Sequence, residues 1–236
     1  MKTSIKGYTK PDMWYRQQSN CRIKYINAID KEVLRYVNSP MLDIGSGDGI
    51  RAVRIAQIGD ISNLVLSDPS PDMAQACSNL KVSKVYKCSA EDLNKVNINT
   101  KFELITCLWN VLGEISKEYM STAINNMASL LSPTGKLVID VSNRYNIKQY
   151  GIKEVTKNVL TDIIPLLPRR GKFNYTINQN ETEVHLCSYF FSPNQLEPMF
   201  KKVRLTIHTK KFFDYQTGQE VHSPFEGHLL YVLKHI

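Results

Sequence analysis

A run of alternating glycines near residue 45 is the first feature of the sequence that could do chemistry. The segment MLDIGSGDG (41–49) has Gly45, Gly47 and Gly49 directly after an apolar stretch. Glycine lacks Cβ, so it lets the backbone turn tightly and approach a ligand, which the amides of a following helix then face. A dinucleotide fingerprint, G-x-G-x-x-G, would need its third glycine where Ile50 stands. The spacing therefore favours a cofactor without phosphates over a pyrophosphate cofactor or a plain surface turn.

Asp68 is the second residue whose place suggests a chemical role. It follows the apolar run 64–66 and precedes a proline-containing turn. At the end of a strand, a carboxylate can accept hydrogen bonds from the two vicinal hydroxyls of a ribose. Alone, Asp68 would be an ordinary loop aspartate, but together with the glycine run it predicts a ribose-binding site.

The apolar pattern around these residues predicts strands that alternate with helices. Short apolar runs indicate strands, and apolar residues that recur every three to four positions indicate helices. Strands are expected at 41–44, 64–66, 85–88, 104–108 and 137–141, with helices at 26–37, 53–58, 69–80 and 119–131. This alternation predicts an α/β fold with a Rossmann-like, seven-stranded, mostly parallel sheet flanked by helices. The loops after the strands then share one edge of the sheet, where ligands bind.

After residue 141 the alternation stops, which indicates an insertion. A β-hairpin is expected from 173–177 and 181–191 around a turn at 178–180, followed by a helix at 193–200 and strands at 203–207 and 229–233. We predict a single domain, 1–236. Its parts are an N-terminal cap and first helix (1–40), a cofactor-binding half (41–141), an inserted substrate lid (142–190), and a C-terminal helix and strands that complete the sheet (191–236).

Composition limits the kinds of partner. The formal charge of +8 would attract phosphates, but the basic residues are dispersed, so solvated surfaces are favoured and a nucleic-acid partner is not expected. The five cysteines form no C-x-x-C pair and the five histidines are scattered, so no metal site is expected. No apolar run approaches the roughly 20 residues of a membrane span, and the N-terminus lacks the apolar stretch of a signal peptide. A soluble, cytoplasmic protein without a membrane partner is therefore expected.

The sequence resembles the class I S-adenosylmethionine-dependent methyltransferases in four segments that occur in order: MLDIGSGDG, LSDPSPDM, CSAEDL and FELITCLWNVLGEI. The resemblance implies that S-adenosylmethionine is the cofactor. Its implied contacts are Asp43, Gly45, Ser46 and Gly47 around the methionine moiety, Asp68 at the ribose, Met73, Ala90 and Glu91 at the adenine, and Leu108 beside the reactive end. Met73 could equally be an ordinary core residue of a helix.

In such enzymes the loop after the fourth strand holds the methyl group and the acceptor. Trp109, Asn110 and Glu114 lie in that loop, so Trp109 and Asn110 are candidates for substrate binding. Asn110 and Glu114 are candidate catalytic residues, because they could orient an amine or take its proton. Trp109 could instead pack between the sheet and a helix.

The segment LVIDVSNRYN is distantly similar to the glycine and sarcosine N-methyltransferases, which have an arginine, an asparagine and a tyrosine just after the fifth strand. The similarity implies that Arg144 and Tyr145 bind substrate at the mouth of the pocket. Arg144 would clamp a substrate carboxylate, and Tyr145 is the third catalytic candidate. In the same relatives the segment of Arg22 folds over the cofactor, so Arg22 could pair with the cofactor carboxylate. Both arginines could instead be exposed and unpaired.

We therefore expect an enzyme that transfers a methyl group from S-adenosylmethionine to a small-molecule acceptor, to nitrogen more than to oxygen. The insertion at 142–190 favours a small acceptor, because it could enclose one. One alternative is an RNA or protein/peptide methyltransferase, which the positive charge supports, although the fourth motif lacks the N-P-P-Y type of sequence of base-modifying enzymes. Another is a non-catalytic, cofactor-binding partner subunit. The identity of the acceptor and the oligomeric state stay open.

Overall fold

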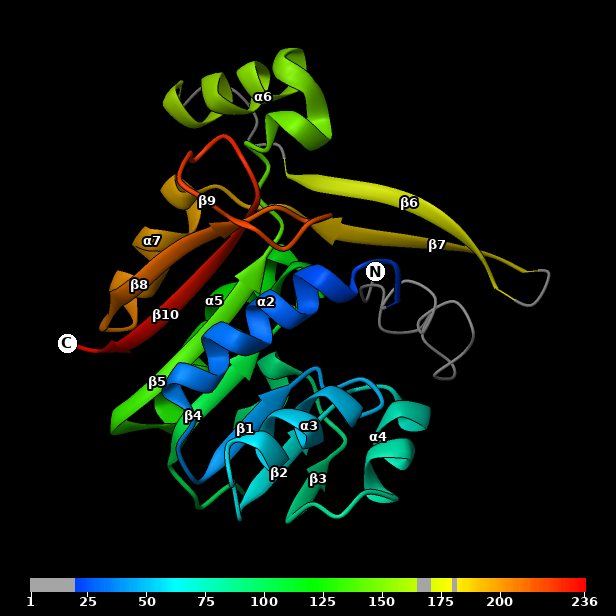
Figure 1. Ribbon diagram of the computed structural model, residues 1–236, viewed down its shortest axis with the longest axis vertical. Helices are drawn as coiled ribbons and strands as arrows, with labels where there is room; N and C mark the ends of the chain where they lie inside the picture. Colours follow the sequence, from blue (N-terminus) through cyan, green and yellow to red (C-terminus); the bar gives the residue numbers. More distant parts are fainter. Residues whose placement is uncertain (1–19, 165–170, 180–181) are drawn as a thin grey trace.

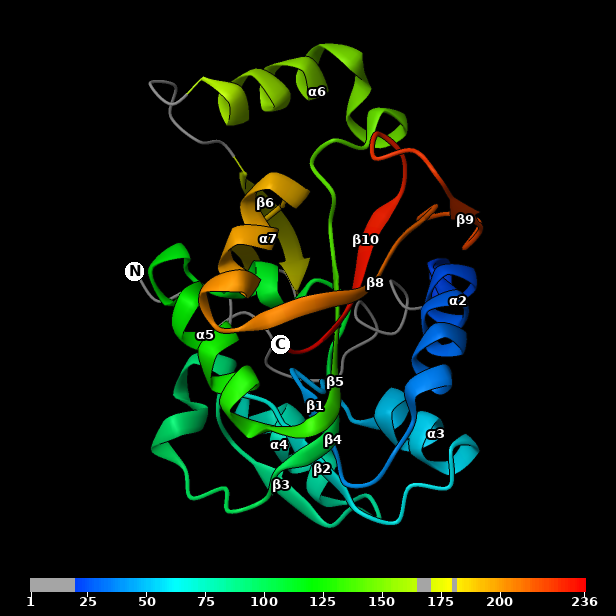
Figure 2. The same ribbon diagram turned by 90° about the vertical axis from the view of Figure 1, so that its left-hand side faces the viewer.

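The computed structural model describes residues 20–164, 171–179 and 182–236 (Figure 1). Residues 1–19 of the expected N-terminal cap lie outside the described residues, as do 165–170 of the expected lid and 180–181 at the expected hairpin turn. The described part of the chain forms one large sheet with helices on both faces, and an insertion stands at one end of it (Figures 1 and 2).

The first part of the sheet is parallel, as the sequence predicts. Its strands are β1 (Met41–Ile44), β2 (Leu64–Ser67), β3 (Lys84–Tyr86), β4 (Phe102–Cys107) and β5 (Leu131–Val141), in the spatial order β3-β2-β1-β4-β5. β1 pairs in parallel with both β2 and β4, so the strand order reverses beside β1. The loops after β1, β2 and β4 therefore meet at one edge, where ligands bind in such sheets.

The second part of the sheet contains antiparallel pairs. β10 (His228–His235) lies between β5 and β8 (Leu205–Phe213) and runs antiparallel to both. The short strand β9 (Glu220–Val221) pairs with β8 at the edge. The predicted fold class is confirmed, but the sheet of the described residues has eight strands rather than seven. The additional strand is β9, and two residues are too few to produce an apolar pattern.

The helices form two layers. They are α2 (Ile23–Val33), α3 (Ile50–Ile58), α4 (Pro71–Ser78), α5 (Lys117–Leu130) and α7 (Pro193–Lys202). Ile29 of α2 shares one buried cluster with Leu230 of β10, whereas Ile124 of α5 shares another with Tyr231 of β10. Neighbouring residues of a strand point to opposite faces, so the two clusters lie on opposite faces of the sheet, as Figure 2 shows for α2 and α5.

Between β5 and α7 the chain leaves the sheet. It forms α6 (Ile147–Ile163) and the antiparallel pair β6 (Lys172–Gln179) and β7 (Thr182–Tyr189), which confirms the expected hairpin. The sequence did not predict α6, because polar residues and Gly151 interrupt any apolar period there. In Figure 1, α6 stands above the end of the sheet and the hairpin projects sideways from it.

Candidate functional site

A cavity of about 350 Å³ opens where β1, β2 and β4 end. Its volume falls in the range of small-molecule sites. Both charged groups and aromatic rings line it. The described residues of its wall are Tyr25, Asp43, Ile44, Gly45, Ser46, Gly47, Arg51, Ala52, Ile55, Asp68, Pro69, Ser70, Met73, Ser89, Ala90, Leu108, Trp109, Asn110, Val111, Glu114, Ile115, Ser142, Gln149, Ser188, Phe190, Tyr215 and His228.

The glycine loop has a conformation that requires glycine. Gly45, Gly47 and Gly49 have φ values of 68°, 57° and 76°, in the left-handed region that costs other residues about 1–2 kcal/mol. The Gly45 amide donates a hydrogen bond of 2.8 Å to the Ser67 carbonyl, which ties the loop to the end of β2. A Cβ on Gly45 would lie 2.5 Å from Cγ1 of Val111 in the short helix η4 (Val111–Glu114). The loop therefore packs directly against the segment that follows β4.

Asp68 lies in the cavity wall just after β2, as expected. Its carboxylate accepts hydrogen bonds from the amides of Gly47 and Ser70, both at 2.9 Å. Each carboxylate oxygen has a second acceptor position, so the group can still bind a pair of hydroxyls. Burial raises the pKa of Asp68 to about 6, although the two amide hydrogen bonds oppose this shift.

Asp43 is the next-to-last residue of β1 and lies just before the glycine loop. The Thr106 hydroxyl donates a hydrogen bond of 2.5 Å to its carboxylate. Burial raises the pKa of Asp43 to about 6, opposed by this hydrogen bond and by the charge of Arg51. Two buried carboxylates thus lie on either side of the loop, which suits a cofactor that carries positive charge.

Arg51, in the first turn of α3, brings a positive charge to the cavity wall. Its Nε donates to Asp30 at 2.7 Å, whereas its buried Nη2 has no hydrogen-bond partner among the described residues. Burial lowers the pKa of Arg51, but the charges of Asp30, Asp140 and Asp43 outweigh burial and raise it. An unpartnered donor in this wall suits the carboxylate of an amino-acid ligand. Sequence reasoning missed Arg51, although a basic residue in the first turn of a helix, where the dipole favours acids, was a usable signal.

The residues expected near the adenine are only partly brought together, because Met73 and Ala90 line the cavity but Glu91 does not. Ser46, expected at the methionine moiety, and Leu108, expected beside the reactive end, also line it. The Glu91 carbonyl instead accepts a hydrogen bond of 3.0 Å from the Asn126 side chain of α5. The contacts of these residues with a cofactor stay predictions.

Trp109 and Asn110 form a left-handed turn after β4, both with φ of 59°. Their amides donate to the carboxylate of Asp140 in β5, and the Tyr25 hydroxyl of α2 donates to the same carboxylate at 2.8 Å. Burial raises the pKa of Asp140, while Arg51 and these hydrogen bonds oppose the shift. A single buried carboxylate therefore holds together three elements at this end of the cavity.

The side chain of Asn110 links β7 to the residue that follows β5. Its Nδ2 donates to Ser188 Oγ of β7 at 2.8 Å, and its Oδ1 accepts the Ser142 amide at 2.9 Å. Asn110 lines the cavity as expected, but these bonds favour a role in positioning over a catalytic one. Trp109 and Glu114, the other residues expected in this loop on the acceptor side, also line the cavity.

Arg144 and Tyr145 do not line the cavity, which corrects the prediction that they bind the acceptor. The side chain of Arg144 is 2% exposed and forms an ion pair with Asp162 of α6. The Tyr145 hydroxyl donates to the same carboxylate, and burial together with this bond raises the pKa of Tyr145 to about 12. The physical reason is that a buried guanidinium needs a buried anion, and Asp162 provides it.

The sequence did not reveal an aromatic wall opposite the glycine loop. The ring of Tyr215 stacks on His228 with centroids 4.2 Å apart, and Trp109 Nε1 donates to the Tyr215 hydroxyl at 3.2 Å. Gln149 of α6 forms a 3.0 Å hydrogen bond with His228 Nε2. Burial and the charge of Arg22 lower the pKa of His228 to about 3, so its ring is neutral at physiological pH. Arg22 stacks on Tyr215 at 4.5 Å but does not line the cavity, so its pairing with the cofactor carboxylate stays a prediction.

The described residues contain no group of three or more His, Cys, Asp or Glu side chains that could hold a metal ion. Within the same part of the chain, none of the helices combines the length and the apolar character needed to cross a membrane.

The fold and the site agree with the resemblance seen in the sequence. A parallel sheet with an antiparallel strand beside β5, a glycine loop after β1 and an acidic residue after β2 fit the expected likeness to the class I S-adenosylmethionine-dependent methyltransferases. Residues 42–137 match the family model described as a methyltransferase domain. No curated protein matches the chain.

Solved structures share the fold over nearly the whole chain. An S-adenosylmethionine-dependent methyltransferase from Clostridium acetobutylicum is 18% identical, with a TM-score of 0.60 over 90% of this chain and 91% of the other. A possible histamine N-methyltransferase from Thermotoga maritima is 16% identical, with a TM-score of 0.59 over 93% of both chains. A methyltransferase from Bacteroides fragilis, solved with S-adenosylhomocysteine, is 16% identical, with a TM-score of 0.60 over 88% of this chain and 76% of the other.

Residues 42–137 thus form a methyltransferase domain, and the described part of the chain has the fold of solved S-adenosylmethionine-dependent methyltransferases. The residues of the cavity fit this cofactor. Asp68 can accept the ribose hydroxyls, Arg51 has an unpartnered donor for the carboxylate, and Asp43 offers a negative charge to the cationic methionine moiety.

The raised pKa of Asp68 predicts that cofactor binding weakens in mild acid. Ribose hydroxyls donate to the ionised carboxylate, so the ligand lowers this pKa and, below pH 6, binding must release a proton. The Kd of S-adenosylhomocysteine, measured by calorimetry, should be constant above about pH 7 and rise by up to about tenfold per pH unit below about pH 6. Asp68→Asn should bind weakly with a flatter profile. If the variant keeps the full pH dependence, Asp68 is not the titrating group.

Gly45→Ala should weaken cofactor binding specifically. The new Cβ would lie 2.5 Å from Val111 Cγ1 at a φ of 68°, so both the loop and η4 must shift. Gly59→Ala is a matched control, because its Cβ would crowd Val37 Cγ1 at 2.2 Å outside the cavity. Both variants should lower the Tm, but only Gly45→Ala should raise the Kd of S-adenosylhomocysteine, by about tenfold. Equal Kd values for the two variants would contradict this account of the loop.

Proposed function

We propose that the protein methylates the nitrogen of a small amine that carries no carboxylate or phosphate. The observation that supports this proposal is the charge of the cavity wall. Among the described residues that line the cavity, the carboxylates of Asp43, Asp68 and Glu114 face a single guanidinium, that of Arg51. An anionic acceptor would be repelled by this wall, whereas an ammonium ion is attracted to it.

The two arginines that could bind an acceptor carboxylate have other partners. Arg51 is paired with Asp30, and its remaining donor suits the carboxylate of the cofactor. Arg144, the clamp implied by the similarity to glycine and sarcosine N-methyltransferases, is paired with Asp162 away from the cavity. An amino-acid acceptor would therefore bury its carboxylate without a partner among the described residues of the wall, which is unfavourable by several kcal/mol.

Glu114 is the residue proposed to orient the amine and to take its proton. S-adenosylmethionine, when bound, supplies an electrophilic methyl group. The protein must then align the acceptor nitrogen and keep it neutral. Glu114 lines the cavity at the end of η4, on the side of Trp109. His228 lines the same cavity, but its pKa of about 3 makes it a neutral hydrogen-bonding group and not a base.

One structural neighbour is described as a possible histamine N-methyltransferase, and histamine is an amine of the proposed kind. At 16% identity the likeness concerns the fold, so the proposal rests on the charges of the cavity wall. The RNA alternative has no comparable support among the described residues of this wall, because polyanionic RNA would meet its carboxylates.

Paired acceptors test the proposal directly. Histamine differs from histidine, and tyramine from tyrosine, only by the lack of a carboxylate. Glycine as acceptor tests the expected similarity to the glycine and sarcosine N-methyltransferases. With radiolabelled S-adenosylmethionine, each amine should have a kcat/KM at least about tenfold above that of its amino acid, because the wall leaves a carboxylate unpaired. Preference for the amino acids would overturn the proposal, and so would label that enters only RNA or protein when a cell extract is supplied.

Glu114→Gln should lower kcat for an accepted amine by about 100-fold, the effect typical of losing a general base. The Kd of S-adenosylhomocysteine should stay within about twofold, because Glu114 is not proposed to bind the cofactor. Glu118→Gln, at an exposed position in α5, is the matched control and should change neither constant. Unchanged turnover in Glu114→Gln would remove Glu114 from the mechanism.

A further inference from the structure

α6 consists of two parts that meet at Gly151. This residue has φ of 78° and ψ of 157°, a conformation that glycine adopts readily and other residues do not. A Cβ at Gly151 would have no atom within 4 Å, so packing does not hold the backbone there. The helix therefore has a short first turn, 147–150, and a longer part, 152–163, with a glycine between them that can act as a hinge.

The first turn of α6 contributes to the wall of the cavity. Gln149 lines the cavity and bonds to His228 at 3.0 Å. The ring of Tyr150 stacks on Phe190, another residue of the wall, with centroids 5.5 Å apart. The position of this turn thus decides the shape of the cavity on the side away from the glycine loop.

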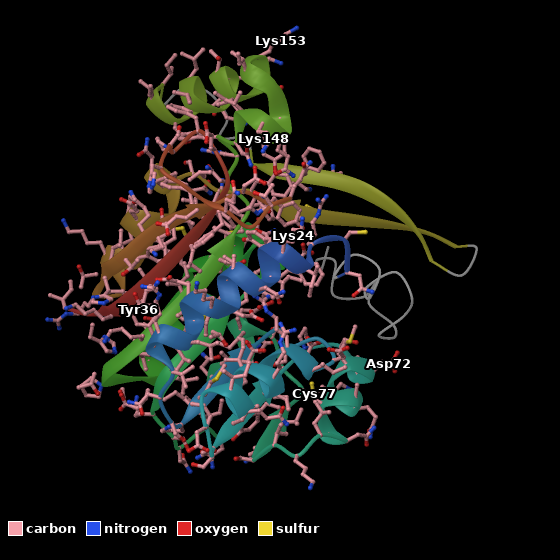
Figure 3. The ribbon with its side chains drawn as sticks, in the orientation of Figure 1. Lys24, Tyr36, Asp72, Cys77, Lys148 and Lys153 are labelled. Carbon is pink, nitrogen blue, oxygen red and sulfur yellow. The ribbon has the colours of Figure 1, made fainter. Side chains whose placement is uncertain are left out.

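A third contact connects the first turn to the loop of Tyr215. Lys148 Nζ forms an ion pair of 2.5 Å with Asp214, which also accepts the amides of Gln216 and Thr217. In Figure 3, Lys148 lies on the side of α6 toward the body of the protein, whereas Lys153, just after Gly151, points away from the body. The first turn therefore faces the site, and the longer part leads away from it.

The longer part of α6 is held at Asp162. Its carboxylate accepts hydrogen bonds from Ser192 Oγ at 2.6 Å, from the Tyr145 hydroxyl and from the Arg144 guanidinium. Asn158, one turn earlier, donates to the Arg144 carbonyl at 3.0 Å. Burial alone would raise the pKa of Asp162, but the bonds from Ser192, Tyr145 and Arg144 outweigh it and hold this pKa below its usual value. The carboxylate is thus ionised and attached to both the segment after β5 and the start of α7.

The rest of this part is largely open to solvent. Ile152, Leu160 and Ile163 are 70%, 45% and 66% exposed. Figures 1 and 2 show α6 at the end of the molecule, apart from the helices that cover the sheet. Its position therefore depends strongly on the buried, charged contacts of Asp162.

We propose that Asp162 is a positioning residue, and that the first turn of α6 is a lid which Asp162 holds closed against the acceptor side of the cavity. The contacts of Asp162 fix the longer part of α6 to Arg144 and Tyr145, which lie just before the first turn with Gln149. Release of these contacts lets the helix move about Gly151 and opens a path for the acceptor. The proposal does not depend on which acceptor is used.

Two substitutions test this role without removing a residue of the cavity wall. Asp162→Asn keeps the shape of the side chain and removes its charge, and Tyr145→Phe removes one donor without leaving a buried charge unpaired. Glu154→Gln is the matched control, because it neutralises a half-exposed carboxylate on the same helix whose ion pair is with Lys157. Hydrogen exchange followed by mass spectrometry measures opening of 147–164. Acrylamide quenching of Trp109, in a Trp14→Phe background, measures access to the cavity.

Tyr145→Phe should raise amide exchange in 152–163 by about tenfold, the factor expected for losing one hydrogen bond to a charged group. Asp162→Asn should raise it further, because the buried Arg144 then loses its anion. Acrylamide quenching of Trp109 should increase in the same variants. Amide exchange in β1 and β4 and the Kd of S-adenosylhomocysteine should equal those measured for the Glu154→Gln control. Exchange in α6 equal to that of Glu154→Gln would overturn the proposal. Faster exchange across the whole sheet, or faster exchange in α6 with unchanged Trp109 quenching, would also overturn it, because Asp162 would then have only a structural role.

Discussion

The acceptor end of the cavity depends on one buried charge, the carboxylate of Asp140. A carboxylate without access to water must be matched by hydrogen-bond donors. Asp140 receives them from the Tyr25 hydroxyl and from the amides of Trp109 and Asn110. These donors come from α2 and from the turn after β4, so pairing one charge fixes the relative positions of two elements and β5. The left-handed turn at Trp109 and Asn110 is unfavourable in isolation and is maintained because it directs both amides to the same carboxylate.

Features encoded in consecutive residues were predictable from the sequence. Gly45 and Gly47 adopt a backbone conformation that favours glycine, and Asp68 stands directly at the end of a strand, so their spacing was enough to predict the binding edge. The parallel pairing of β1 with β2 and β4 followed from the alternation of strands and helices. The role of Arg144 was not predictable in this way, because the partner of a buried charge is decided by distance in space. Its partner, Asp162, lies 18 residues later in a helix without a clear apolar period.

The aromatic wall was missed for a related reason. Tyr25, Tyr215 and His228 come from α2, from the loop after β8 and from the start of β10, so no local pattern unites them. Arg51 differs, because it stands just beyond the glycine loop, where a ligand-facing cation could have been expected. The overall charge of +8 was a poor guide to the site, since the cavity wall carries more carboxylates than guanidinium groups. The net charge of the protein affects its attraction to large charged partners, whereas the charges of the cavity wall affect which small ligand binds there.

The place of β10 in the sheet has a consequence for synthesis of the protein. β10 lies between β5 and β8 although it follows both in the sequence, and it pairs residues as distant as Leu229 and Val141. A nascent chain leaving the ribosome therefore presents β5 and β8 with unpaired edges before the strand that separates them has been made. Pairings between such distant residues form slowly, so this interval favours binding by chaperones and exposes the chain to aggregation. His228 belongs to that late strand, and the aromatic wall of the site is therefore assembled only when the sheet closes.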